Sequence, residues 1–146
     1  MALLDLRTVS YPTAGTATRP DLHVVESIRQ RTGVAAADIT EGAPVRYDAN
    51  GKWVPAQGTT APNARAYGIA LRTVKAGQAL TVLKTGTVEG VDVSALAYDA
   101  PVYLSDTAGR LDTVAGTVSV VVGRVVAAHG HERIGGTPSK LLEVSL

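Results

Sequence analysis

The sequence APVRYDANGKWV at residues 43–54 returns in altered form as APVYLSDTAGRLD at residues 100–112. Each copy runs into a turn, at Asn50-Gly51 in the first and at Ala108-Gly109 in the second, and an apolar residue follows. The copies continue with YGIA at 67–70 and VGRV at 122–125, and they close with LTV at 80–82 and LEV at 142–144. Two rounds of short apolar runs divided by turn residues predict a duplicated all-β domain, with pseudo-repeats at about 41–91 and 98–146.

Turn residues divide the chain at the short intervals that a β-sandwich or small β-barrel requires. Asn50-Gly51 predicts a type I′ hairpin turn. Thr85-Gly86 predicts a turn between two separate strands, at residues 79–84 and 87–93. Further along, residues 117–127 predict one long strand.

Residues 22–31 are open to two interpretations. A helix would begin after Asp21 and place Leu22, Val25 and Ile28 on one face. A strand would align Leu22 and Ile28 with Val24 instead, with a glutamate interrupting the pattern. We favour the strand, because everything after this segment indicates β structure.

The composition predicts a thin, aliphatic core. The chain has 146 residues, which is one domain by length, but it contains no Phe or Cys and only six Tyr and Trp residues together. Twenty valines and sixteen threonines take their place, and these β-branched residues suit a pleated sheet. Since aromatic side chains normally bury the largest areas, we expect contacts between subunits to supply part of the stability.

Charge and hydropathy argue against two classes of partner. The formal net charge is +1, and the basic residues are scattered, so no cluster could neutralise several nucleic-acid phosphates at once. No apolar run approaches the length of a membrane span. We therefore expect neither nucleic acid nor membrane as a partner.

Residues 1–20 are predicted to form an extended arm before a single β domain at 21–146. Pro12, Gly15 and Pro20 forbid a regular helix and interrupt a hairpin. A disordered tail is the simpler alternative, but the segment carries more apolar side chains than a tail needs. We expect the arm to order against another chain through Leu3, Leu4, Leu6, Val9 and Tyr11.

No catalytic or metal-binding motif stands out. His129 and His131, with Glu132, are the best metal candidates, but they lie in a Gly-rich segment far from the third histidine. We interpret them as loop residues and expect no metal or cofactor. The chain also lacks a cysteine and a Gly-x-Ser-x-Gly nucleophile elbow, so we expect no enzyme activity.

Asp99, Asp106 and Asp112 recur in the second copy and could in principle pair as acid and base or bind calcium. Their spacing does not match a calcium loop. We interpret them as turn residues whose carboxylates accept hydrogen bonds from nearby backbone amides, with Gly109 at a positive φ.

Six valines between residues 118 and 126 make a nearly continuous apolar run, which predicts that both faces of the segment are covered. We expect Val118, Val120 and Val122 to contribute to a subunit interface. The single tryptophan, Trp53, follows the Asn50-Gly51 turn and has two possible roles. It could pack across the hairpin, or it could be a further anchor of the interface.

Residues 38–146 resemble the capsid decoration (cement) proteins of tailed bacteriophages. The resemblance rests on ITEGAPV at 39–45, YGIA at 67–70, KAGQALTV at 75–82, APVYLSDTAG at 100–109 and VVGRV at 121–125. It implies a small β-barrel or β-tulip-like subunit that forms a homotrimer on the outer surface of an icosahedral capsid, after synthesis in the bacterial host cytoplasm. There it would bridge subunits of the major capsid protein.

The leading hypothesis is therefore a structural virion protein that stabilises the capsid shell. The alternative is a tail, baseplate or host-surface-binding β module of a phage. Exposed aromatic side chains gathered at one end would favour the alternative, whereas the six aromatic residues are spread along the sequence.

Overall fold

The computed structural model describes residues 2–10, 18–20, 22–128 and 139–146, and these residues form strands but no helix. The strands are β1 (Thr8–Ser10), β2 (Thr18–Pro20), β3 (His23–Val34), β4 (Pro44–Tyr47), β5 (Trp53–Pro55), β6 (Gly68–Ala70), β7 (Ala79–Glu89), β8 (Pro101–Leu104), β9 (Leu111–Asp112), β10 (Val121–Ala128) and β11 (Ser139–Ser145). The prediction of an all-β fold is confirmed, and residues 22–31 lie almost wholly in a strand.

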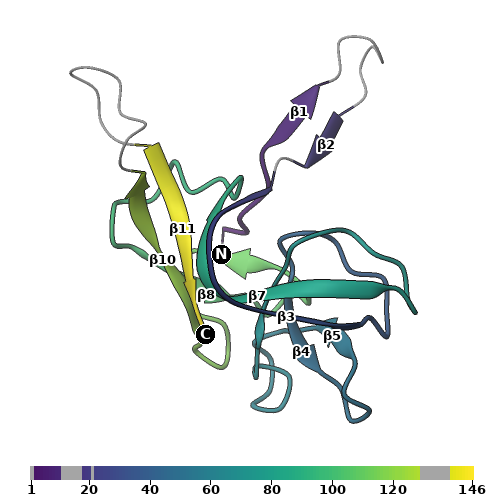
Figure 1. Cartoon of the computed structure of the whole chain (residues 1–146). Helices are drawn as coiled ribbons and strands as arrows, with labels where there is room; N and C mark the ends of the chain where they lie inside the picture. Colours follow the sequence, from purple (N-terminus) through teal and green to yellow (C-terminus); the bar gives the residue numbers. More distant parts are fainter. Residues whose placement is uncertain (1, 11–17, 21, 129–138) are drawn as a thin grey trace, which may run out of the picture.

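Most strands join one antiparallel sheet. Its order is β5-β4-β6-β7-β11-β10-β8-β9, and β3 pairs with β7 beside this path. The sheet curls into a half-barrel (Figure 1), and its strand order ends in β5 and β4 on one side and in β8 and β9 on the other. A small β-barrel-like domain is thus what the strand spacing predicted. β1 and β2 pair only with each other among the described strands, and they project from the body (Figure 1).

The sheet consists of two units with the same internal order. The first unit is β5-β4-β6-β7 and the second is β9-β8-β10-β11, and the two meet where β7 pairs with β11. Both units also place a residue with positive φ just before the first strand. These are Gly42 (φ 81°) and Asp99 (φ 66°), whose backbone amides donate to Ala70 and Val125 over the same 2.7 Å.

The register of the ladders matches residue by residue. Val45 pairs with Gly68 in the first unit, and Val102 pairs with Gly123 in the second. An added Cβ at Gly68 would overlap the backbone carbonyl of Leu83, and one at Gly123 would overlap that of Glu143. Both positions therefore require glycine for the same reason: the neighbouring strand passes too close to leave room for a side chain.

The strands that close the two copies do not correspond in the way that the sequence pattern suggested. Ala70 pairs with Val82 in the first unit, and Val125 pairs with Leu142 in the second. Val82 therefore corresponds to Leu142, so LTV at 80–82 matches residues 140–142 and not LEV at 142–144. Apolar residues alternate along both strands, which makes a two-residue shift invisible in the pattern.

The Asn50-Gly51 turn is not of type I′, which needs a positive φ at both central residues. Only Gly51 has one, at 74°. The Asp48 carboxylate accepts hydrogen bonds from the amides of Asn50 (2.8 Å) and Lys52 (2.9 Å). These bonds stabilise a longer loop that ends in a glycine, and they hold the pKa of Asp48 below its usual value, with the Lys52 amide as the main cause.

Two strand boundaries also differ from the predictions. Thr85-Gly86 is not a turn, since β7 continues through it from Ala79 to Glu89. Gly86 lies in close contact with the backbone of Glu26 on β3, which is why the position is glycine. The expected strand at 117–127 begins only at Val121, because the preceding residues form an irregular connection.

Two apolar clusters make the core, and the equivalent faces of the two units differ in what covers them. Ile69 pairs with Leu83 across β6 and β7, and both side chains are completely buried. The equivalent pair in the second unit is Arg124 with Glu143, and both side chains are exposed. The second unit packs over this face of the first unit, whereas its own corresponding face meets solvent.

Candidate interaction surfaces

The N-terminal leucines lie against the body of the same chain. Leu3 and Leu6 form isolated bridges with Asp112 and Val91, and the Leu4 amide donates to the Leu111 carbonyl at 3.0 Å. The side chains of Leu4 and Leu6 pack on the larger core cluster. Three of the predicted arm residues are therefore already in contact with their own domain.

The sequence suggested that the whole arm is extended, but part of its remainder forms a two-stranded ladder. Thr8–Ser10 pairs antiparallel with Thr18–Pro20, and this places Val9 opposite Arg19. We had expected Pro12 and Gly15 to interrupt a hairpin here. Each strand is only three residues long, however, and neither strand contains Pro12 or Gly15. Tyr11 lies outside the described residues.

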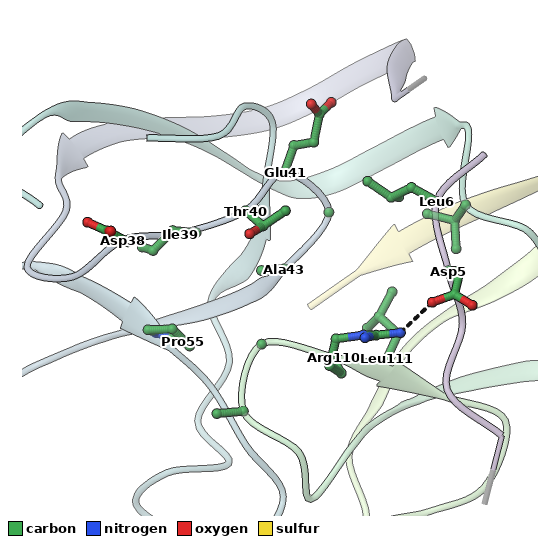
Figure 2. Close-up of a pocket in the computed structure, with 14 residues that line it drawn as sticks. Asp5, Leu6, Asp38, Ile39, Thr40, Glu41, Ala43, Pro55, Arg110 and Leu111 are labelled. Carbon is green, nitrogen blue, oxygen red and sulfur yellow. Dashed lines mark hydrogen bonds and ion pairs between the residues drawn. The ribbon is translucent and has the colours of Figure 1, made fainter. Parts of the chain in front are cut away.

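A hollow of about 440 Å³ lies between the two units, and Asp5 and Leu6 of the N-terminal segment are among the residues that line it (Figure 2). Leu6 points into it and touches Gly42, where a Cβ would lie 2.9 Å from the leucine Cδ2. At the rim, the Arg110 guanidinium donates to the Asp5 carboxylate at 2.6 Å. Across the hollow, the Ala76 amide and then the Lys75 ammonium hold the pKa of Asp38 below its usual value. The chain's own N-terminal segment thus forms one wall of the hollow.

The aspartates considered as acid–base or calcium candidates accept hydrogen bonds from nearby groups of the chain. Asp112 is buried and accepts hydrogen bonds from the amides of Ala2 (3.0 Å) and Val114 (3.2 Å). Asp106 accepts from the Thr117 amide and hydroxyl, both at 2.8 Å. Over the part of the chain that the structure describes, no group of three or more His, Cys, Asp or Glu side chains could hold a metal ion.

Other sequence features have simple structural positions. Gly109 has a φ of 70°, as expected for a turn. His129, His131 and Glu132 lie outside the described residues. In the described residues, no helix is long and apolar enough to cross a membrane.

The residues predicted for a subunit interface differ in exposure. Val122 and Trp53 are completely buried within the chain's own core. Val118 and Val120 are half-buried and pack against the larger core cluster, and Val121 is exposed. The valine run is covered mostly by its own domain. Its first part lies in an irregular connection that packs on the core, and its second part lies in β10, which has only one apolar face.

Three of the aromatic residues converge, although they are spread along the sequence. Trp53 stacks on Tyr47 with ring centroids 4.2 Å apart, and Tyr67 lies 5.3 Å from Trp53. Trp53 packs across the hairpin, since Tyr47 is its partner in the β4–β5 ladder. The cluster belongs to the smaller core and is not an exposed aromatic platform.

Four of the seven large hydrophobic residues that are exposed in the described chain lie on one strand, and the sequence did not predict this surface. Strand β3 is exposed along almost its whole length, including Val24, Val25, Ile28 and Val34. Among the described residues, β3 pairs only with β7, so its other edge is open. The only sequence signal was the ambiguous periodicity of residues 22–31, which mixes apolar and charged residues on both faces.

Comparison with protein families places the chain beside a family of capsid proteins. The family described as "XM1 gp53 minor capsid protein" matches residues 9–146, which is nearly the whole chain. A comparison with curated proteins gives no match.

Proposed function

The chain belongs to the XM1 gp53 minor capsid protein family, which makes it a capsid-associated structural protein of a phage virion, and we propose that it decorates the capsid. In this proposal it sits on the outer surface of the icosahedral shell as a homotrimer. It stabilises the shell by bridging neighbouring subunits of the major capsid protein. The family match over residues 9–146 is the observation that carries the proposal.

The architecture supports this role. A protein that bridges shell subunits needs a rigid body and a separate attachment element. The half-barrel supplies the body, since its larger cluster buries side chains from both units and its smaller cluster buries side chains of the first unit and the residues just before it. The β1–β2 ladder supplies a projecting element that leaves the body beyond Arg7 (Figure 1).

The proposed attachment device is therefore the segment of residues 8–20, which carries Val9 and Tyr11. The leucines before it have a different role. Leu4 and Leu6 anchor the root of the segment on the half-barrel, so that the ladder is held at a fixed place. Three such segments per trimer would turn modest single contacts into strong attachment.

The decisive experiment measures binding to capsids that lack the protein. We expect the wild-type chain to co-sediment with capsids and to raise the temperature at which they rupture. In the test variant, a Gly/Ser linker replaces residues 8–20 and leaves Leu4 and Leu6 in place. It should keep the wild-type melting temperature but bind capsids poorly.

A deletion of residues 1–20 is a weaker test, because it also removes the leucines that pack on the core. A Thr60→Ala variant serves as the control, since this exposed residue lies far along the chain from the segment. Full-affinity decoration by the linker variant would refute the role of residues 8–20. Unchanged capsid stability with the wild-type protein would refute the decoration proposal itself.

A further inference from the structure

An apolar hollow of about 360 Å³ lies beside the first half of β3. Its apolar lining comes from Val25 on β3, from Leu141 on β11, and from residues 126–128 on β10. Leu141 and Ala128 are buried, whereas Val25 is 52% exposed. Two carboxylates, those of Glu26 and Glu143, stand at the hollow.

Ile28 is an apolar projection three residues further along the same strand. It is 68% exposed, the highest value among the large exposed hydrophobic residues of the described chain. Ser27 pairs with Gly86 and Arg29 pairs with Thr85, so Ile28 is the extra residue of a β-bulge. A bulge turns its side chain away from the sheet, and here it turns an isoleucine into solvent. Single exposed apolar side chains are common on protein surfaces, but Ile28 shares one strand with the exposed Val24, Val25 and Val34, and such a group of apolar side chains favours contact with a partner.

The charges along β3 are divided between its two halves. Glu26 stands at the hollow together with Glu143 of β11, and Arg29 and Arg31 follow Ile28 along β3, with Arg29 on the same face as Glu26 and Arg31 on the opposite face. No ion pair within the described residues involves Glu26, Glu143 or Arg29. Arg31 reaches the Tyr47 hydroxyl at 3.4 Å but has no carboxylate partner there. The surface therefore carries two carboxylates at the rim of the hollow, one of them opposite Arg124 in the β10–β11 ladder, and the Arg29 guanidinium beside Ile28.

We propose that this surface, formed by β3 and the adjacent hollow, binds a second copy of the same chain. Ile28 of one copy enters the hollow of the next, and its neighbour Arg29 approaches Glu26 and Glu143 there. Each copy offers both a projection and a hollow, so the contact is head-to-tail. A head-to-tail contact that closes on itself makes a ring, and three copies make the trimer of the proposed function, on which this inference rests.

The geometry favours a second copy over the pairing of a foreign strand with the open edge. Val25 and Ile28 are both bulge residues, because neither has a partner in the β3–β7 ladder. Bulges disrupt the regular row of amides and carbonyls that an added strand needs. The contact must then run through side chains, and the opposite charges on one surface match another copy of that surface. Ile28 and the hollow beside Val25 are about 10 Å apart along the strand. Because the two contacting parts of each copy are so close together, the symmetry axis of the ring passes close to β3.

The first test is Ile28→Asp, with the mass in solution measured by sedimentation equilibrium. The wild-type chain should be a trimer, and the variant should associate roughly 30-fold more weakly or worse, because a carboxylate would enter an apolar hollow beside two others. Val114→Asp is the matched control, since Val114 is also exposed (49%) and is not on β3. The control should remain trimeric. An Ile28→Asp trimer of wild-type strength would overturn the proposal.

The second test exchanges charges within β3. Glu26→Arg and Arg29→Glu should each weaken the trimer, whereas the double variant should recover most of the lost affinity, because the contact again joins opposite charges. Circular dichroism verifies that each variant is folded. A double variant as weak as the sum of the single variants would contradict the charge pairing. A wild-type dimer would contradict the head-to-tail ring.

Capsid binding separates this inference from the proposed function. A wild-type protein that is monomeric in solution and still decorates capsids at full affinity would overturn the β3 contact alone. A trimer that depends on Ile28 but does not bind capsids would overturn the decoration proposal and leave the β3 contact intact.

Discussion

Replacing Gly68 by alanine places a methyl group against the backbone of the neighbouring strand. The added Cβ would lie 2.7 Å from the carbonyl carbon of Leu83 and 2.8 Å from Cγ1 of Val82, and it would overlap the Leu83 carbonyl oxygen. Leu83 and Val82 are completely buried, so neither can move aside without shifting the β6–β7 ladder. Overpacking of this kind costs about 3 kcal/mol, which lowers the melting temperature of a 146-residue chain by about 10 °C.

Gly123→Ala should cost about as much as Gly68→Ala, because the added Cβ would lie 2.9 Å from the carbonyl carbon of Glu143. Gly51→Ala is the control. Its Cβ would meet nothing within 4 Å, and only its positive φ of 74° is unfavourable for alanine, at about 1–2 kcal/mol. Thermal and urea unfolding followed by circular dichroism measure all three variants. If Gly68→Ala and Gly123→Ala destabilise less than Gly51→Ala, the close approach of the strands is not what requires glycine there.

Three further predictions concern single side chains. Since the Lys52 amide holds the pKa of Asp48 below its unfolded value, the carboxylate stabilises the fold fully above that unfolded value, and this contribution is lost as the pH falls through the folded pKa. The gap in melting temperature between wild type and Asp48→Asn should therefore narrow below roughly pH 4, and a constant gap would contradict this. Leu6→Ala should lower the unfolding free energy by about 1–2 kcal/mol in urea titrations, because the side chain packs on the core; no change would mean that the terminus is not docked. Trp53→Ala should cost about 3–5 kcal/mol, because the buried indole stacks on Tyr47, and a cost below 1 kcal/mol would contradict a core role.

The doubled strand pattern could be predicted because it depends on local chemistry. Glycine and proline divide the chain into short runs, and β-branched residues between them form strands wherever they pack. The correspondence of Val45 with Val102 and of Gly68 with Gly123 follows from these local signals. The same signals failed where a glycine serves a long-range contact. Thr85-Gly86 has the composition of a turn, but Gly86 is small because β3 crosses it.

The candidate surfaces were less predictable, because the same apolar residue can face its own core or a partner. Val122 and Ile28 are similar residues in similar strands, yet the structure buries the first completely and leaves the second 68% exposed. The N-terminal leucines posed the same problem, since nothing in their sequence distinguishes a contact with the chain's own body from one with another chain.

The sequence by itself therefore determined the all-β class and the doubled pattern of short strands, because each depends on a few neighbouring residues. Only the tertiary structure decided which face of each unit is covered. Ile69 and Leu83 are buried where Arg124 and Glu143 are exposed, although the two pairs are equivalent. The physical reason is that the curl of the sheet folds the second unit over the first, and burial depends on that long-range contact rather than on the pattern within either strand.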